Sequence, residues 1–242
     1  MKRWIVVATV LGIAMPSAAF ASPKLDSALC DAAEHGTPAT IAKLVKKGAN
    51  KNAICSDWQA TPLENAAHLD KIANMTALLN AGADVDAWSG GDACCQQTAL
   101  GFARSVPTAS LLIAHHANVN IRRASDGYTP LIWLSMSVTM ASSDESADVD
   151  TGVAKLLIDA GADVNAAGND GLTPLGMGIG AHSKSFVVLL LDHGANINAR
   201  NSFGVSPLGV TLNGENNPLT SADDAQGLRE IEALLRSRGA VE

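Results

Sequence analysis

Residues 161–165 read Gly161-Ala162-Asp163-Val164-Asn165, and residues 173–175 read Thr173-Pro174-Leu175. Both motifs recur along the chain. Further Gly-Ala-type steps, one with His in place of Gly, begin at Gly48, Gly82, His116, Gly194 and Gly239, and further openings of the Thr-Pro-Leu type begin at Thr61, Thr98, Thr129 and Ser206. The intervals between successive Gly-Ala steps are 34, 34, 45, 33 and 45 residues. A unit of this length cannot bury its own apolar face, so the pattern predicts a stack of similar units.

The chemistry of the two motifs predicts where helices begin and end. Thr or Ser before Pro is typical of a helix N-cap followed by Pro at the first helical position, where its missing N–H is no loss. Leucine pairs give each second helix a buried stripe; they are Leu111-Leu112, Leu156-Leu157, Leu189-Leu190 and Leu234-Leu235. The following Gly supplies a left-handed stop, and His116 is expected to form a slightly strained one.

The motifs resemble those of the ankyrin repeat family, over nearly all of the chain after the first two dozen residues. The resemblance implies an all-α repeat solenoid of about six repeats including caps, each a β-hairpin finger followed by two antiparallel helices. It also implies a protein partner, bound through the fingertips and the inner helix face. The expected units are 25–53, 54–87, 88–121, 122–166, 167–199 and 200–242.

The first 21 residues have the order of a secretory signal peptide. Lys2 and Arg3 precede an apolar run from Trp4 to Met15, and Ala19-Phe20-Ala21 is a small-x-small cleavage motif. The apolar run is shorter than the roughly 20 residues that span a bilayer. The sequence therefore predicts export to the bacterial periplasm with Ser22 as the mature start, no membrane attachment after cleavage, and a monomer. A buried N-terminal helix is the alternative.

The charge balance narrows the class of partner. Loss of Lys2 and Arg3 would leave 15 basic against 24 acidic residues, a formal charge of −9. No Lys/Arg-rich face is then available to release counterions from phosphates, which argues against nucleic-acid binding. A basic partner is favoured, although net charge acts first on solubility and encounter rates.

The four cysteines, Cys30, Cys55, Cys94 and Cys95, are disulfide candidates in an oxidising compartment. Cys30 lies in the first helix pair and Cys55 in the finger that enters the second unit. Pairing of Cys55 with Cys30, or with Cys94 or Cys95 of the next finger, is geometrically open. A zinc site of Cys94, Cys95, His115 and His116 is disfavoured because adjacent residues rarely face one metal ion.

No catalytic residue or cofactor site is expected. The histidines fall at recurring repeat positions, and the chain lacks nucleophile, phosphate-loop and paired metal motifs. Asp148, Asp150 and Gly152 only superficially echo a calcium loop, whose ligand spacing they do not match. The aspartates are expected just before a second helix, within one of two insertions, around 140–150 and 213–223, that should form loops.

Candidate partner-binding residues occupy the fingertips and the inner face of the first helices. They are Asp57, Trp58, His68, Trp88, Ser125, Asp126, Tyr128, Met136, Asn169, Asp170, Ser202 and Phe203. Trp58, Trp88, Tyr128 and Phe203 are aromatic residues where the repeat core requires none, and such residues commonly anchor interfaces. The resemblance implies support of periplasmic enzymes such as catalase in oxidative defence. An immunity-type inhibitor of a toxic periplasmic enzyme is the alternative.

Overall fold

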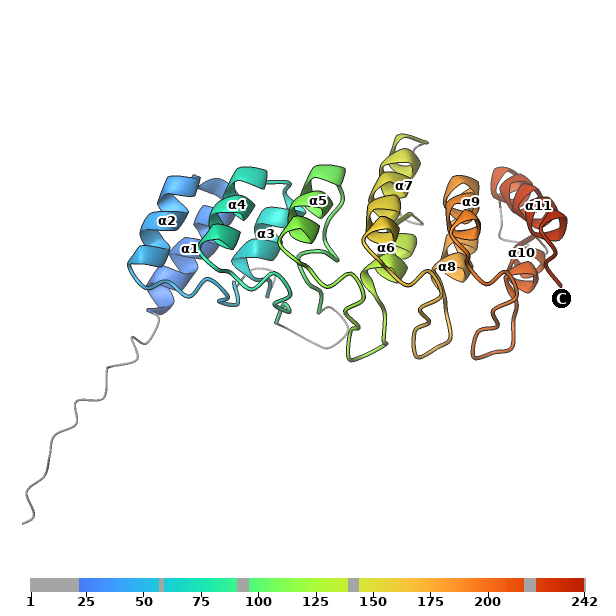
Figure 1. The fold of residues 1–242 in the computed structure, drawn as a ribbon, viewed down its shortest axis with the longest axis horizontal. Coiled ribbons are helices and arrows are strands. Elements are labelled where there is room, and N and C mark those ends of the chain that lie inside the picture. The colour runs from blue at the N-terminus through green and yellow to red at the C-terminus, as the bar shows by residue number, and fades with distance from the viewer. Residues whose placement is uncertain (1–21, 57–58, 91–95, 139–143, 216–220, 242) are drawn as a thin grey trace, which may run out of the picture.

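The computed structural model describes residues 22–56, 59–90, 96–138, 144–215 and 221–241, with the side chains of 137–150 excepted. These residues form eleven helices stacked side by side in two rows (Figure 1). One row holds α1 (Pro23–His35), α3 (Pro62–His68), α6 (Pro130–Val138), α8 (Pro174–Gly180) and α10 (Pro207–Glu215). The other holds α2 (Pro38–Lys46), α4 (Ile72–Asn80), α5 (Val106–Ala114), α7 (Asp144–Asp159), α9 (Lys184–Asp192) and α11 (Ala222–Ser237). The predicted all-α repeat solenoid is confirmed.

The Thr-Pro openings cap helices as the sequence predicts. The side chain of Thr61 accepts a hydrogen bond from the backbone N–H of Glu64, and the Glu64 carboxylate accepts one from the N–H of Thr61, which completes a capping box. Thr173 caps α8 through the N–H of Gly176. Each cap satisfies backbone donors that a helix N-terminus leaves without partners.

The six Gly-Ala steps all adopt the left-handed stop. Their first residues have positive φ: Gly48, Gly82, His116, Gly161, Gly194 and Gly239. His116 reaches φ 66°, which confirms the strained cap expected there. The Ala that follows is buried in the first four steps, and in all six its N–H returns to a carbonyl of the preceding turn, as Ala162 N does to Leu157 O at 2.9 Å. A short helix thereby ends at the same point in every repeat.

The Asn or Asp residues after each stop form one continuous hydrogen-bonded ladder. Within a step, a side-chain oxygen accepts from the backbone two residues on, as Asp163 Oδ1 does from Asn165 N at 2.8 Å. Between steps, the second residue accepts from the next repeat, as Asn120 Oδ1 does from Asp163 N at 2.8 Å. The ladder starts at Asp26, which accepts from Asn50 N, and ends where Val241 N donates to Asn198. It fixes the spacing of neighbouring repeats along the solenoid.

The core is a continuous apolar strip shared between neighbouring repeats. Leu29, Leu63, Leu112, Leu157 and Leu190 are at most 1% exposed, and one cluster of packed side chains joins them from the first repeat to the last. Burial of this strip is the main contribution to stability, at about 25 cal/mol for each Å² removed from water.

The third repeat departs from the expected helix pair. After Thr98, residues 99–102 make a single tight turn, with hydrogen bonds such as Phe102 N to Ala99 O at 3.2 Å, in place of a first helix. Pro is absent after Thr98, and Gly101 is a poor helix former. A longer finger before this turn keeps the period near 34 residues, which is why the periodicity alone did not reveal the difference.

The described residues of both insertions lie mainly in helices, while 139–143 and 216–220, where loops are expected, lie outside the described part. Residues 144–150 belong to α7, so Asp148 and Asp150 lie inside a helix and the expectation that they precede it is wrong. Residues 213–215 end α10, and residues 222 and 223 begin the sixteen-residue α11. A longer second helix absorbs added residues without leaving their backbone groups unpaired.

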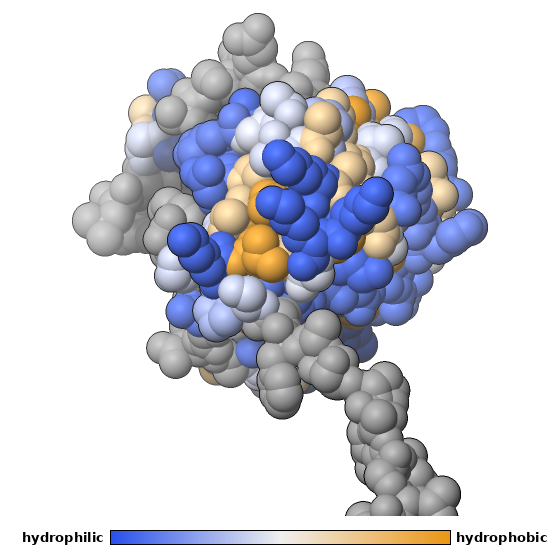
Figure 2. Space-filling view, turned by 90° about the vertical axis from the view of Figure 1, so that its left-hand side faces the viewer, coloured by the Kyte–Doolittle hydropathy of each residue, from blue (hydrophilic) through white to orange (hydrophobic). Residues whose placement is uncertain are grey.

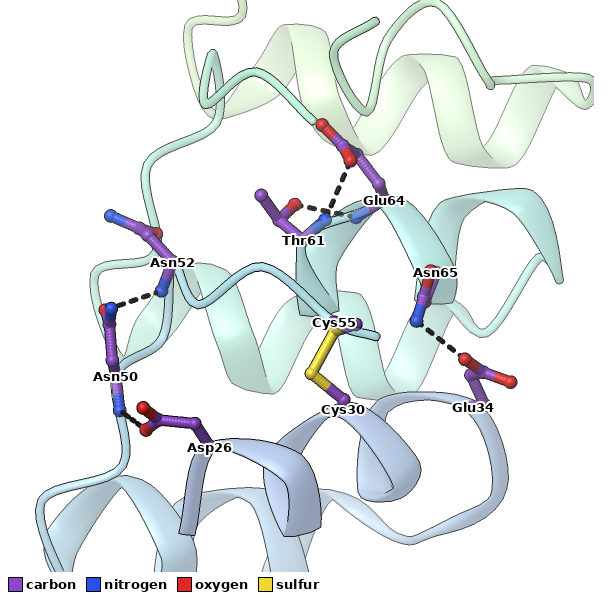
Figure 3. Close-up of a disulfide and its surroundings, with 9 residues drawn as sticks. All are labelled: Asp26, Cys30, Glu34, Asn50, Asn52, Cys55, Thr61, Glu64 and Asn65. Carbon is purple, nitrogen blue, oxygen red and sulfur yellow. Dashed lines mark hydrogen bonds between the residues drawn. A yellow bond between two sulfur atoms is a disulfide. The ribbon is translucent and has the colours of Figure 1, made fainter. Parts of the chain in front are cut away.

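A disulfide joins Cys30 of α1 to Cys55 in the first finger, with Cα atoms 5.7 Å apart (Figure 3). This settles one of the pairings left open by the sequence. Cys94, Cys95, Asp57, Trp58 and residues 1–21, for which the sequence predicts a signal peptide, lie outside the described residues. At the N-terminal end, hydrophilic side chains border a small hydrophobic area (Figure 2), as suits a terminal repeat with one face in water.

Candidate functional site

The fingers form a row of hairpin loops along one edge of the stack of helices (Figure 1). Each is closed by a backbone hydrogen bond across its base, such as Arg123 N to Tyr128 O at 3.0 Å and Asn201 N to Val205 O at 3.1 Å. No strand is assigned among the described residues, so these fingers are hairpins without a regular ladder. Short hairpins of this kind present their tips at defined positions.

Backbone hydrogen bonds hold the last three fingers in register. Asn169 N donates to Asp126 O at 2.7 Å, and Ser202 N donates to Asp170 O at 2.9 Å. Side-chain oxygens of Asp126 and Asp170 accept from backbone N–H groups two residues on, which shapes each turn. A glycine with positive φ follows in each finger: Gly127, Gly171 and Gly204. The fingertips therefore form a preorganised surface.

Phe203 protrudes from the last of these fingertips, with 85% of its surface exposed. Ser125, Asn169 and Ser202 are also exposed at the tips, while Asp126 and Asp170 are half-buried by their turn hydrogen bonds. An aromatic side chain kept in water is the strongest sign of a partner contact on this edge.

Tyr128 is buried at 9% exposure and is not a surface anchor, contrary to the sequence-based expectation. Its hydroxyl donates to Asp170 Oδ2 at 2.5 Å, and its ring meets Trp133 edge-on at 6.1 Å. Burial and the Asp170 carboxylate both raise the pKa of the Tyr128 hydroxyl above its ordinary value, so it stays protonated. Tyr128 joins two fingers and does not extend from one.

Arg123 is the residue that the sequence reasoning missed in this region. Its side chain is only 5% exposed, and its guanidinium lies 4.2 Å from the centre of the Trp133 ring and pairs with Asp126. Burial alone would raise the pKa of Asp126, but hydrogen bonds from Arg123 and from the Tyr128 backbone hold it below its ordinary value. Arg123 therefore stiffens the finger of the fourth repeat. A basic residue five places before an aromatic is a weak signal in sequence.

Trp88 is half-buried beside this cluster, where it lines a hollow of about 10 Å³ with Arg123 and Trp133. The hollow has room for about one water molecule. Met136 is half-buried at the last turn of α6. Neither side chain is presented to a partner as openly as Phe203.

His68 helps to form a larger hollow on the inner face of the first three repeats. The hollow has a volume of about 390 Å³ and is lined by Glu34, Ala60, Glu64, Asn65, His68, Leu69 and Phe102. His68 and Phe102 meet edge-on, with ring centres 5.9 Å apart, and Leu69 is 42% exposed. One wall is thus apolar and aromatic.

The other wall of this inner hollow is acidic. Glu34 of α1 accepts a hydrogen bond at 2.6 Å from the side chain of Asn65 on α3 (Figure 3). Glu64 is 1% exposed; its Oε2 accepts from Thr61 N, and its Oε1 has no partner among the described residues. Burial raises the pKa of the Glu64 carboxyl from 4.5 to about 8, partly opposed by the amides of Thr61 and Ser89.

Glu34 also borders a neighbouring hollow of about 700 Å³ beside the disulfide. Asp26 and Asp31 line it, together with apolar Ile54, which is 47% exposed. No Lys or Arg lines either hollow among the described residues. The inner face near the N-terminus is therefore acidic with apolar patches.

The described residues contain no group of three His, Cys, Asp or Glu side chains placed to hold a metal ion. Cys94 and Cys95, of the disfavoured zinc site, and the side chains of Asp148 and Asp150 lie outside the described part. His115 and His193 cap helices, and His182 pairs with Asp224 at 3.0 Å. Within the same residues, no helix is long and apolar enough to cross a bilayer.

Comparison with protein families matches residues 170–202 to the ankyrin repeat. Among curated proteins, alpha-latrocrustotoxin-Lt1a from Latrodectus tredecimguttatus is 31% identical over 144 residues, which are 60% of this chain. The match spans only 9% of the toxin's length, so it shows similarity to a short part of the toxin and not to the toxin as a whole.

Solved ankyrin repeat domains share the whole architecture. One from Acinetobacter baumannii is 26% identical, with a TM-score of 0.67 over 88% of this chain and 98% of its own. The domain of human ASB11 is 25% identical, with a TM-score of 0.60 over 84% of this chain and 81% of its own. The domain of Bcl-3, a member of the IkappaB protein family, is 24% identical, with a TM-score of 0.69 over 89% and 87%. At that identity it supports the fold alone.

Proposed function

Because the chain belongs to the ankyrin repeat family, whose repeats are protein–protein interaction modules, we propose that it is a non-enzymatic binding protein that holds a protein partner against its fingertips and inner helix face. The extended, concave surface of a repeat stack suits this role. We further propose that it works as a monomer in the bacterial periplasm, where the Cys30–Cys55 disulfide would persist.

The observation that carries this proposal is Phe203. A protein gains nothing in stability from holding an aromatic side chain 85% exposed, and large aromatics in exposed patches often dominate binding energy. The fingers that flank it are preorganised by backbone hydrogen bonds, so binding would need little ordering of the chain.

The test is capture of partners from periplasmic extract by the purified protein, followed by affinity measurement on the partner identified. Phe203→Ala should weaken binding roughly a hundredfold if Phe203 is an anchor, which corresponds to about 2–3 kcal/mol. Val241→Ala is the matched control, because Val241 is also exposed, at 60%, but lies at the end of the last repeat. Equal affinity of both variants and the parent would count against the fingertip surface.

The role of the complex is proposed in two forms. In the first, which rests on the family resemblance, the protein supports an enzyme of oxidative defence, so the captured partner is a catalase or peroxidase and loss of the protein sensitises cells to hydrogen peroxide. In the second, the protein blocks a toxic periplasmic enzyme, so the partner is that enzyme and its activity falls on binding. Identifying the partner separates the two.

A further inference from the structure

The inner hollow of the first three repeats, defined by Glu34, Ala60, Glu64, Asn65, His68, Leu69 and Phe102, has the features of a pocket for one particular side chain. We propose that it receives an arginine side chain of the protein partner. This inference rests on the proposed function, because it assigns partner chemistry to part of the same inner face.

The shape and lining of the hollow fit the stem of such a side chain. Its volume of about 390 Å³ exceeds that of a single amino-acid side chain, so a residue can enter with part of its backbone. Leu69 is 42% exposed and Phe102 is half-buried at the mouth. Arginine buries its methylene stem along apolar surface while its guanidinium stays with polar groups. The Phe102 ring also offers a face on which a guanidinium can lie.

The acidic wall of the hollow suits the guanidinium at the tip of an arginine side chain. Glu34 is fixed by Asn65, which holds its carboxylate at the rim of the hollow. Glu64 lines the hollow from α3, but its carboxyl is buried, and the amides of Thr61 and Ser89 partly oppose the effect of burial on its pKa, so Glu34 is the carboxylate offered to a partner. A guanidinium carries five N–H donors in a planar fork and can pair with the Glu34 carboxylate through two of them.

Charge around the hollow points the same way. The neighbouring hollow adds Asp26 and Asp31, and neither hollow is lined by Lys or Arg among the described residues. His35 and His68 are the other titratable groups that border them.

The test uses a small probe, so it does not depend on knowing the partner. N-acetyl-arginine methylamide is titrated into the ¹⁵N-labelled full chain, and the uncharged isostere N-acetyl-citrulline methylamide is titrated in parallel. We expect saturable shifts of the backbone amide signals of Glu34, Asn65, His68 and Phe102 with the arginine probe. Citrulline should bind at least roughly tenfold more weakly, because its ureido group lacks the charge and has a carbonyl oxygen in place of one N–H₂ donor group.

Two variants localise the effect. Glu34→Gln keeps an oxygen for Asn65 but removes the charge, and it should weaken the arginine probe roughly tenfold. Asp223→Asn makes the same charge change at an exposed position on α11, in the last repeat, and should leave affinity within about twofold. Equal binding of citrulline, equal affinity of the two variants, or shifts confined to other residues would overturn the proposal.

Failure here is distinguishable from failure of the proposed function. If a captured partner loses affinity with Phe203→Ala but keeps it with Glu34→Gln, the fingertip surface stands and the arginine pocket does not. If it loses affinity with neither, both proposals fall.

Discussion

At the scale of single residues, apolar side chains in this chain serve opposite purposes depending on their position in the repeat. Leu190, in the second helix of its repeat, is fully buried in the shared strip. Phe203, in the next finger, is 85% exposed. The same hydrophobic chemistry stabilises the stack at one position and is available to a partner at the other.

This difference predicts contrasting effects of truncation. Leu190→Ala should lower the free energy of unfolding by about 2–5 kcal/mol, since it removes a buried side chain and leaves a cavity. Phe203→Ala should change it by no more than about 0.5 kcal/mol. Urea unfolding monitored by circular dichroism measures both. A loss of stability in Phe203→Ala as large as that in Leu190→Ala would show that the fingertip aromatic is structural.

Glu64 predicts an unusual dependence of stability on pH. Burial raises the pKa of its carboxyl from 4.5 to about 8, so the folded state binds this proton more tightly than the unfolded state does. The contribution of the protonated Glu64 carboxyl to folding stability is therefore complete below pH 4.5 and is lost as the pH rises towards 8. Relative to Glu64→Gln, which cannot titrate, the parent should lose about 3–5 kcal/mol of unfolding free energy over that range.

The measurement is urea unfolding of both proteins at several pH values from 4.5 to 9. Taking the difference between the two removes the contributions of histidines and other carboxyl groups that they share. If the two curves of unfolding free energy against pH run parallel, Glu64 titrates in its ordinary range and the orphaned oxygen has a partner in solution.

At the scale of elements, the hydrogen-bonded ladder joins neighbouring repeats. Replacing one of its polar side chains should therefore destabilise the fold, even though that side chain is exposed. Asn120 accepts from Asp163 N and donates to Gly161 O, each at 2.8 Å. Asn120→Ala removes both bonds between two repeats and should lower the free energy of unfolding by about 1–3 kcal/mol. Asn80→Ala, at an exposed helix end, is the control and should stay within about 0.5 kcal/mol. Similar unfolding midpoints for both variants would show that the ladder contributes little to stability.

The disulfide joins an element of the first repeat to the finger of the second across 25 residues. Closing a loop of that length is expected to stabilise the protein by about 3.5 kcal/mol, mainly by restricting the unfolded chain. A reducing agent should therefore lower the unfolding midpoint of the parent and leave the double variant Cys30→Ala/Cys55→Ala unchanged. Sensitivity of the double variant to reductant would instead assign the effect to Cys94 and Cys95.

Much of this architecture could be predicted because the same helix-capping and helix-ending motifs occur in several successive repeats. The caps at Thr61 and Thr173 and the stop at His116 follow from backbone chemistry alone, and all three are confirmed. The contacts within the candidate site were harder to predict from the sequence. The burial of Tyr128 depends on Asp170, one repeat away, and the role of Arg123 depends on Trp133. Pairings between repeats are contacts in space that a periodic pattern in one chain does not specify.

At the scale of the whole molecule, shape and charge act together. An elongated stack with 24 acidic and 17 basic residues presents a large, negatively charged surface. Such a surface speeds encounter with basic partners at low ionic strength and is screened beyond about 8 Å at physiological salt. The acidic hollows at one end and the exposed aromatic near the other place two contacts far apart along the same molecule, which favours a partner that lies along the solenoid.

Export is the last prediction and belongs to the whole chain. The basic start, the apolar run and Ala19-Phe20-Ala21 predict cleavage before Ser22, and the Cys30–Cys55 bond requires a compartment where disulfides persist. Mass spectrometry of protein from the producing cell should find Ser22 at the N-terminus and no free thiol at Cys30 or Cys55. The control is an Ala19→Arg/Ala21→Arg variant, in which cleavage should fail. An intact Met1 form in the soluble cytosol, with both thiols free, would contradict export and remove the disulfide's contribution to stability in the cell.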